Sequence, residues 1–197
     1  MSPEAHDGIA AGMQAAPLAN AFAASDVEEI LRERGWLAPN ANRAATDADA
    51  RVEHFSAWLE LAAALLGPHS SDRNALADLL TLVFHCDASA SLATADAQDV
   101  MARVGSREVI RELANLILDG APIDSERFRE IVEALKIATR YRSRELFHPI
   151  RLALAGRAGE GELDRVILLL DSAATLPFAV AVKGTRQRML EFCAALE

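Results

Sequence analysis

An all-α fold is predicted for this chain of 197 residues, because three features of the sequence favour helix. Hydrophobic residues make up 51% of the chain, with abundant Ala and Leu, few aromatic residues and almost no β-branched runs. Apolar residues recur at spacings of three and four, and capping residues and glycines bracket the resulting segments. We find no convincing strand pattern and no internal repeat.

Four helices are expected in the first hundred residues. The first opens with the capping-box spacing Ser25 to Glu28, and the long second one ends at Gly67 followed by proline. Trp36 and Trp58 fall in helical or helix-end positions and are expected to anchor the core. The four segments cover residues 25–35, 47–66, 70–86 and 94–105.

Further helices are expected in the second half, over residues 106–120, 122–141, 161–171 and 182–196. Gly105 is expected to stop one helix and Ser106 to cap the next, and this break predicts two helical subdomains, 25–105 and 106–197. Residues 1–24 are expected to form a flexible Ala-rich tail, because they lack the charged start and compact apolar run of a signal peptide.

The charge of −9 is unevenly distributed along the chain. Residues 1–100 hold 5 basic and 15 acidic side chains, a balance of −10, whereas residues 101–197 hold 15 and 14, a balance of +1. An anionic partner is therefore expected on the second half.

Cysteine usage and hydropathy exclude several protein classes. Cys86 and Cys193 are far apart and show no Cys-x-x-Cys spacing, so neither a disulfide framework nor a zinc site is expected, and a reducing cytoplasm fits best. His85 beside Cys86 lacks a third ligand or a matching base, so no metal, cofactor or nucleophile is assigned there. The apolar runs are too short for a membrane span.

The segment 136–157 forms a local basic field whose only carboxylate is Glu145. One interpretation is a solvated helix end, where cations offset the negative end of the helix dipole. The other is a surface that faces phosphates. The six basic residues are Lys136, Arg140, Arg142, Arg144, Arg151 and Arg157.

The order of residues favours the second interpretation. The stretch ELFHPIRLALAGRAGEGELD, residues 145–164, resembles the Pro-Leu/Ile-Arg-x-Ala-Leu-Thr-Gly signature in the anticodon-binding region of bacterial glutamyl-tRNA synthetases. The preceding residues 107–136 are similar to the helical hairpin that leads into it, and residues 182–196 to the closing helix of some members. The resemblance covers most of residues 25–197 and is strong over 107–165.

This resemblance implies two packed helical subdomains, a helical cage that grips the anticodon stem-loop of a tRNA. The signature arginine matches Arg151 and is expected beside an anticodon base, because a guanidinium offers a planar donor fork. The alternative is an arginine that bridges two helices. Pro149 is expected to fix the entry to a short helix, and His148 before it to pack or cap. Binding is expected to centre on Arg151 and its neighbours Arg140, Arg142, Arg144 and Arg157.

The sequence departs from the signature at two places. Ala155 replaces the threonine before the glycine, and Glu160-Gly161 stands where the family has a small residue or threonine followed by proline, in a loop that approaches the anticodon. Glu160 is expected to repel nucleic acid or to pair with Arg151 or Arg157; alternatively it caps the next helix.

The motifs that a class I synthetase needs to hold ATP, His-x-Gly-His and Lys-Met-Ser-Lys-Ser, are absent, as is any βαβ pattern. We therefore expect a non-catalytic tRNA-binding module, with tRNA-Glu as one candidate and a separate catalytic chain as a further partner. Preserved cations, including Lys183, Arg186 and Arg188, favour this hypothesis. A degenerate copy that serves as a protein-interaction scaffold, favoured by the acidic first half and Glu160, and a fragment or split gene product remain alternatives.

Overall fold

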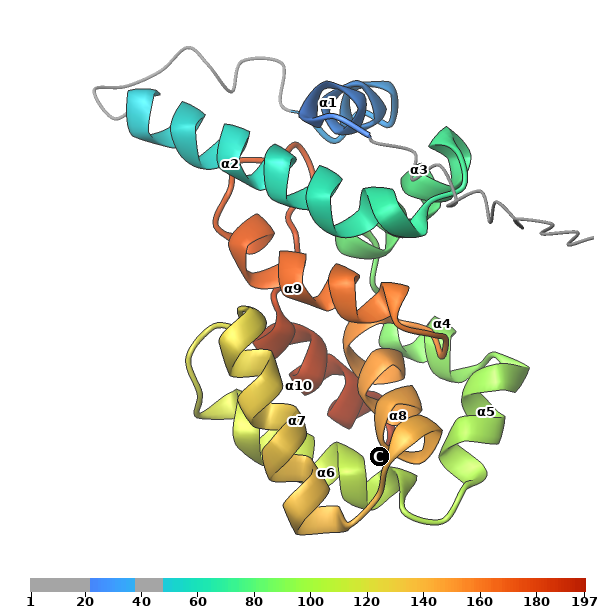
Figure 1. The fold of residues 1–197 in the computed structure, drawn as a ribbon. Coiled ribbons are helices and arrows are strands. Elements are labelled where there is room, and N and C mark those ends of the chain that lie inside the picture. The colour runs from blue at the N-terminus through green and yellow to red at the C-terminus, as the bar shows by residue number, and fades with distance from the viewer. Residues whose placement is uncertain (1–21, 38–47) are drawn as a thin grey trace, which may run out of the picture.

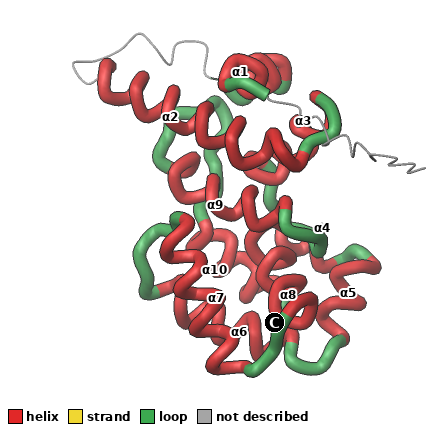
Figure 2. Tube along the Cα trace, viewed as in Figure 1, coloured by secondary structure: helices red, strands yellow, loops and turns green. Residues whose placement is uncertain are grey.

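The computed structural model describes residues 22–37 and 48–197, and the regular elements in these ranges are helices, as predicted (Figures 1 and 2). The expected tail, residues 1–24, lies almost wholly outside the described residues. In the described ranges, β pairing is confined to one isolated bridge between Leu37 and Phe178. The helices are α1 (Ala24–Glu33), α2 (Ala48–Leu66), α3 (Arg73–Phe84), α4 (Ala88–Leu92), α5 (Ala95–Ala102), α6 (Ser106–Leu118), α7 (Ser125–Thr139), α8 (Ser143–Ala155), α9 (Glu162–Ala174) and α10 (Thr185–Ala195), with a 3₁₀ turn (Gly67–His69) after α2.

Several helix starts are capped by short polar side chains that accept backbone N–H groups. At the start of α1 the predicted cap Ser25 is wrong: the N-cap is Ala23, two residues earlier, and the Asp26 carboxylate accepts the Ala23 N–H at 2.7 Å. The short helix α4 was not predicted from the sequence, although Asp87 caps it through the Ala90 N–H at 3.0 Å. Other side-chain caps of this kind are Asp72, Thr94 and Asp124.

The helices form two groups that meet at α9. Figure 1 shows α1, α2 and α3 at one end of the molecule and α5 to α8 at the other, with α9 between them. Helix α9 packs against α2 and α3 on one side and α8 on the other, while α4 and α5 pack against α10, α6 and α8. Helices of each half of the sequence thus contact helices of the other half. The division at residue 105 stays a prediction.

An aromatic cluster joins the first helices to the segment after α9. Trp36 stacks on Phe84 with ring centroids 4.4 Å apart, and Phe178 meets both Phe84 and Trp58 edge-on. Trp58 also donates its indole N–H to the Leu169 carbonyl of α9 at 3.3 Å. Both tryptophans are buried, which confirms the prediction that they anchor the core.

A buried arginine ties the last helix to the rest of the fold. Arg188 of α10 donates to the carbonyl groups of Val83, Leu154 and Lys183 at 2.6, 2.8 and 2.9 Å, and only 1% of the residue is exposed. Two of these carbonyls lie in the last turns of α3 and α8, where backbone acceptors lack helical partners. Arg188, one of the cations that favoured the tRNA-binding hypothesis, is therefore buried and bound within the fold.

Among the described residues, no helix is both long and apolar enough to cross a membrane.

Candidate nucleic-acid interface

Helix α8 carries the proline-arginine stretch and is longer than the sequence suggested. It begins at Ser143, so Pro149 lies inside the helix, and the prediction that this proline fixes the entry is wrong. Proline cannot donate to the carbonyl four residues earlier, a loss that normally ends a helix. The buried face formed by Leu146, Ile150 and Leu154 compensates by packing into the core. Gly156 ends the helix with a φ of 84°.

Arg151 bridges α8 and the α8–α9 loop to α9. Its Nε donates to Asp164 Oδ1 at 2.7 Å and its Nη2 to Oδ2 at 2.8 Å, while Nη1 donates to the Gly159 carbonyl at 2.7 Å. The guanidinium carbon also lies 5.0 Å from the ring centroid of Phe147. The side chain is 8% exposed. Two-pronged pairing of this kind is the strong form of an arginine-carboxylate interaction.

The structure therefore shows Arg151 in the helix-bridging arrangement that the sequence left as an alternative. Its donor fork faces Asp164, so a base edge could reach it only if that ion pair opened. The contact to Gly159 also holds the loop between α8 and α9 against α8. A direct role for Arg151 in binding stays a prediction.

Glu160 pairs with a different arginine from those expected. Its carboxylate accepts from Arg144 Nη2 at 3.2 Å, so the structure does not show the predicted pairing with Arg151 or Arg157. The two side chains are 74% and 65% exposed, and solvent weakens such a pair to little net stability. Gly161 is the N-cap of α9 and no side chain forms a cap hydrogen bond there, but Glu160 directly precedes the cap and its carbonyl accepts the Leu163 N–H at 3.2 Å, so its favourable charge at the helix start stays a prediction.

The remaining predicted arginines fall into two groups. Arg142 donates to the Lys136 and Tyr141 carbonyls at 2.6 and 2.7 Å, which is the helix-end role that cations play at a C-terminus. Arg140, with a φ of 62°, and Arg157 are exposed and have no hydrogen bond or ion pair within the described part of the chain. Arg140 and Arg157 are thus the predicted site residues most available to an anion.

The turn before α6 lies against the turn between α7 and α8. Gly105 has a φ of 93°, and a Cβ on it would overlap the ring of Tyr141, so this position needs glycine. The same turn brings Arg103 to α8, where its Nη1 lies 3.5 Å from Nδ1 of His148. Arg103 was not among the residues selected from the sequence, because 45 residues separate it from its contact on α8.

His148 borders a small pocket of about 200 Å³ between α5, α8 and the α8–α9 loop. Burial, and next the positive charge of Arg103, hold the pKa of His148 below its usual value. The imidazole is therefore neutral near pH 7. Its Nε2 is buried and has no partner among the described residues. The lining residues are Asp96, Asp99, Val100, Arg103, His148, Ala158 and Gly159.

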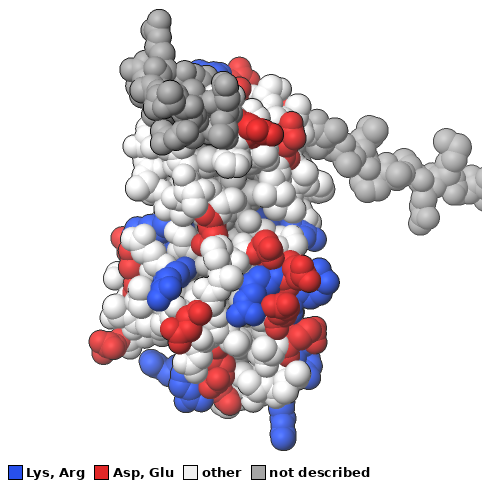
Figure 3. Space-filling view, turned by 90° about the vertical axis from the view of Figure 1, so that its left-hand side faces the viewer, with Lys and Arg blue, Asp and Glu red and all other residues white. Residues whose placement is uncertain are grey.

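The surface carries charges of both signs on the face shown in Figure 3. Basic and acidic side chains intermingle over the lower half of this face, and the band directly above it is mostly uncharged. This face therefore has no broad basic patch of the kind that binds duplex nucleic acid by charge alone.

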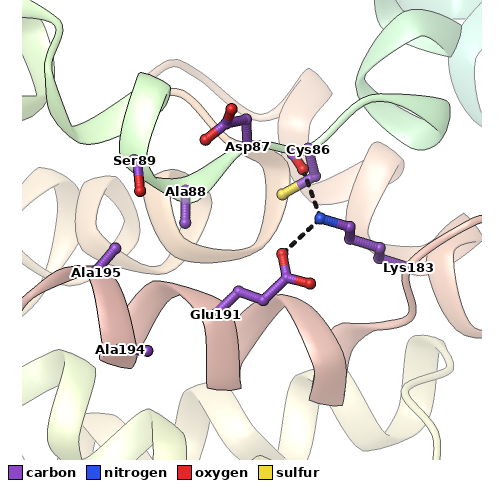
Figure 4. Close-up of a pocket in the computed structure, with 8 residues that line it drawn as sticks. All are labelled: Cys86, Asp87, Ala88, Ser89, Lys183, Glu191, Ala194 and Ala195. Atoms are coloured by element: carbon purple, nitrogen blue, oxygen red, sulfur yellow. Dashed lines mark hydrogen bonds and ion pairs between the residues drawn. The ribbon is translucent and has the colours of Figure 1, made fainter.

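A second pocket, of about 460 Å³, lies between Cys86 and α10 (Figure 4). Lys183 crosses it and donates to Glu191 at 2.6 Å and to the Cys86 carbonyl at 3.1 Å, so its charge is neutralised within the site. Burial raises the pKa of the Cys86 thiol, which keeps it protonated and unreactive near pH 7. Within the described residues, no group of three or more His, Cys, Asp or Glu side chains could hold a metal ion.

Comparison with known proteins identifies the family. The family described as "Anticodon binding domain" matches residues 36–176, more than half of the chain. A similar protein is "Glutamate--tRNA ligase 2" of Syntrophus aciditrophicus (strain SB), with 33% identity over 75 residues. The aligned part is 38% of this chain and only 15% of that relative. No solved structure matches the chain. The match over residues 36–176 shows that this chain belongs to the anticodon-binding domain family.

Proposed function

We propose that this protein binds the anticodon stem-loop of a tRNA and does not itself attach an amino acid. The observation that carries the proposal is the family match over residues 36–176, which spans the helices from α2 to α9. An RNA loop offers phosphates and unstacked bases, and proteins recognise it by charge, stacking and hydrogen bonds to base edges.

The exposed arginines of the second half supply the phosphate contacts. Arg140 and Arg157 are free of internal partners in the described structure, and Arg144 is held only by the exposed pair with Glu160. Arg151 acts on this surface indirectly, because its hydrogen bond to the Gly159 carbonyl holds the loop next to Glu160 in place. In this proposal Arg151 is a positioning residue, and opening of the Asp164 pair is not required for binding.

Binding to isolated RNA hairpins tests the proposal. We expect a hairpin that copies the anticodon arm of tRNA-Glu to bind more tightly than one that copies its acceptor arm. Three neutralised phosphates would give a slope of about −2 in a plot of log affinity against log salt, at roughly −0.7 per charge. Replacing Arg140, Arg144 and Arg157 by glutamine should remove most of this slope. Equal binding of both arms would contradict the proposal.

The absence of catalysis is tested separately. The purified chain with ATP, glutamate and tRNA should form no aminoacyl-tRNA, whereas addition of a catalytic synthetase chain should restore charging. Charging by a preparation shown to be free of host synthetase would overturn this part of the proposal. An effect of this protein on the rate of the added synthetase would support a role as its assisting partner.

A protein-interaction scaffold is the second candidate function. The Arg151–Asp164 pair and the Glu160–Arg144 pair favour it, because each occupies an arginine that was expected to contact RNA. A folded chain that binds no tRNA hairpin at low salt would support the scaffold and contradict tRNA binding.

A further inference from the structure

We propose that an apolar groove between α2 and the end of α9 binds a basic amphipathic helix of a partner protein. The groove consists of two adjoining hollows of about 310 and 510 Å³, which share His54, Thr175 and Leu176. Figure 1 shows the start of α2 and the end of α9 on its left-hand side, which faces the viewer in Figure 3, where the band at this height is mostly uncharged. The inference goes beyond the proposed function and does not rest on it.

The α2 wall of the groove is one face of a helix. His54, Ala57, Trp58 and Leu61 follow the spacing i, i+3, i+4 and i+7, so they form a stripe two turns long, or about 10 Å. Leu61 is 41% exposed, although most large apolar side chains of the described structure are buried. Trp58 is 2% exposed and is held by its indole N–H bond to the Leu169 carbonyl. This wall is therefore preformed and has an uncovered leucine at its edge.

The α9 wall is apolar although two of its residues carry hydroxyl groups. Ser172 Oγ donates to the Leu169 carbonyl at 3.1 Å, and Thr175 Oγ1 donates to the Ser172 carbonyl at 2.8 Å. Both hydroxyl protons are thus used within α9, and the rest of the wall is formed by Leu176 and Pro177. A ligand that is read by hydrogen bonds finds few free donors here, whereas apolar side chains would bury their surface.

The charges at the rim favour a basic partner. Glu53 and Glu60 lie four residues before and three residues after Ala57, so both flank the α2 stripe on the same side of the helix. Both are exposed, and neither has a hydrogen bond or ion pair within the described residues. Residues 172–177 on the other wall carry no charge. The negative rim repels phosphates and anionic membranes and attracts Lys and Arg side chains.

A helix is the segment whose shape fits a groove between two helices. An amphipathic helix places its apolar side chains at i, i+3, i+4 and i+7 into such a groove. Lysines or arginines that flank this apolar face would then lie opposite Glu53 and Glu60. Figure 1 shows α2 at one end of the molecule and the turn between α7 and α8 at the other, so the groove and the exposed arginines are separate surfaces.

Two synthetic helical peptides test the inference with the full chain. Each is about 14 residues long, or four turns, and both have the same leucines at i, i+3, i+4 and i+7. One peptide has lysines beside the leucines and the other has glutamates. The lysine peptide should bind about tenfold more tightly at low salt, and the difference should shrink at high salt. Its binding should shift the amide NMR signals of Leu61, Ser172 and Thr175.

An exposed leucine elsewhere gives the control for the apolar contact. Leu61→Asn should weaken binding of the lysine peptide about tenfold, because an apolar contact is lost. Leu190→Asn, at a leucine of α10 that is 51% exposed, should leave the affinity unchanged.

The charges of the rim are tested in the same way. The double variant Glu53→Gln, Glu60→Gln should lose most of the preference for the lysine peptide. The matched control Glu126→Gln, Glu145→Gln removes the same charge from exposed positions on α7 and α8 and should keep the preference. Circular dichroism confirms that each variant is folded.

Several outcomes would overturn the inference. These are equal binding of the two peptides, signal shifts away from α2 and α9, and equal effects of the groove variants and their controls. A dimer that Leu61→Asn converts to monomers would also overturn it, because the occupant would then be a second copy of this chain. These results leave tRNA binding untouched, and a chain that binds no RNA hairpin could still bind the lysine peptide.

Discussion

The guanidinium of Arg151 and the carboxylate of Asp164 lie edge to edge between α8 and α9, joined by two parallel hydrogen bonds. The arginine at the centre of the signature is thereby part of the framework of the fold. Because the same side chain also binds the Gly159 carbonyl, it holds the loop between α8 and α9 in place. Because Arg151 is bonded within the fold, its effect on stability and its effect on RNA binding can be predicted and measured separately.

Removal of Arg151 is predicted to destabilise the protein. Arg151→Ala leaves Asp164 without its partner at a site that is only 19% exposed, and loss of one member of a buried pair costs about 3 kcal/mol. Urea unfolding of this variant should show a lower midpoint, while the exposed control Arg157→Ala should match the wild type within about 0.5 kcal/mol. An unchanged midpoint for Arg151→Ala would show that the pair contributes no net stability.

In RNA binding the order of the two variants is predicted to be reversed, with the larger loss for Arg157→Ala. Arg157→Ala removes a free surface cation and should weaken hairpin binding, whereas Arg151→Ala should weaken it only as far as the loop at Gly159 is displaced. If Arg151 instead makes a base contact, its loss should cost about 1–3 kcal/mol of binding free energy. Titration at a temperature where both variants are fully folded decides between the two roles.

Glu160 is predicted to oppose nucleic acid by occupying Arg144. Glu160→Gln frees that arginine and removes a negative charge, so affinity for an RNA hairpin should rise, by up to about tenfold at low salt and less at high salt. Glu145→Gln, which removes a charge next to Arg144 without breaking an ion pair, is the matched control. An equal rise in affinity for the two variants would show that Glu160 acts through its charge alone and not by occupying Arg144.

The family-like sequence at this loop should also be tolerated. Gly161 has a φ of −64°, which suits proline, and a side chain there would meet open space. The double variant Glu160→Thr, Gly161→Pro is therefore expected to fold and to bind an RNA hairpin more tightly than the wild type. Weaker binding by a folded variant would show that the alignment through this loop has no functional meaning.

Arg188 is predicted to be more important for stability than any exposed arginine. Arg188→Met leaves the buried carbonyl groups of Val83 and Leu154 without this donor, each costing about 1–3 kcal/mol, and also removes the bond to the half-buried Lys183 carbonyl. Arg186→Met, two residues earlier and exposed, is the control. The melting temperature of Arg188→Met should lie many degrees below that of Arg186→Met. Similar melting temperatures would contradict a stabilising role for the bonds of Arg188.

The titration of His148 is predicted to reflect its pocket. Because its pKa is lowered in the folded protein, the unfolded chain binds more protons just below pH 6.5, so this residue makes the protein less stable as the pH falls through that range. NMR should place its midpoint below 6.5, and Arg103→Met should raise it. His69, an exposed histidine of the 3₁₀ turn, gives a reference signal in the same spectrum. A midpoint unaffected by Arg103→Met would exclude that charge as a cause.

Local signals in the sequence predicted most of the helices but few of the side-chain roles. Apolar spacing and glycine stops predicted the helices at α2 and α6, because these two signals depend only on residues close together in the chain. The short helix α4 escaped, since its five residues carry too little periodicity. Pro149 was read as a boundary by a local rule, and burial of the α8 face outweighed that rule.

The roles of the arginines depended on distant partners. Arg157 and Arg188 look alike in sequence, yet one is exposed and the other is 1% exposed, because Arg188 meets carbonyls that lie 34 and 105 residues away. Arg151 and Asp164 are 13 residues apart, on different helices, so no helical spacing reveals the pair. For the same reason the sequence did not predict the pocket beside Arg103, whose walls come from α5, α8 and the loop after α8.

The bonds of Arg188 also have a consequence for the order of folding. Its guanidinium satisfies the ends of α3 and α8 at once, but it belongs to α10, the last helix of the chain. A ribosome-bound chain that ends before residue 188 contains the Val83 and Leu154 carbonyls but lacks the guanidinium that binds them. The bonds to these two carbonyls form only after residue 188 has been synthesised, and contacts that span 34 and 105 residues form slowly.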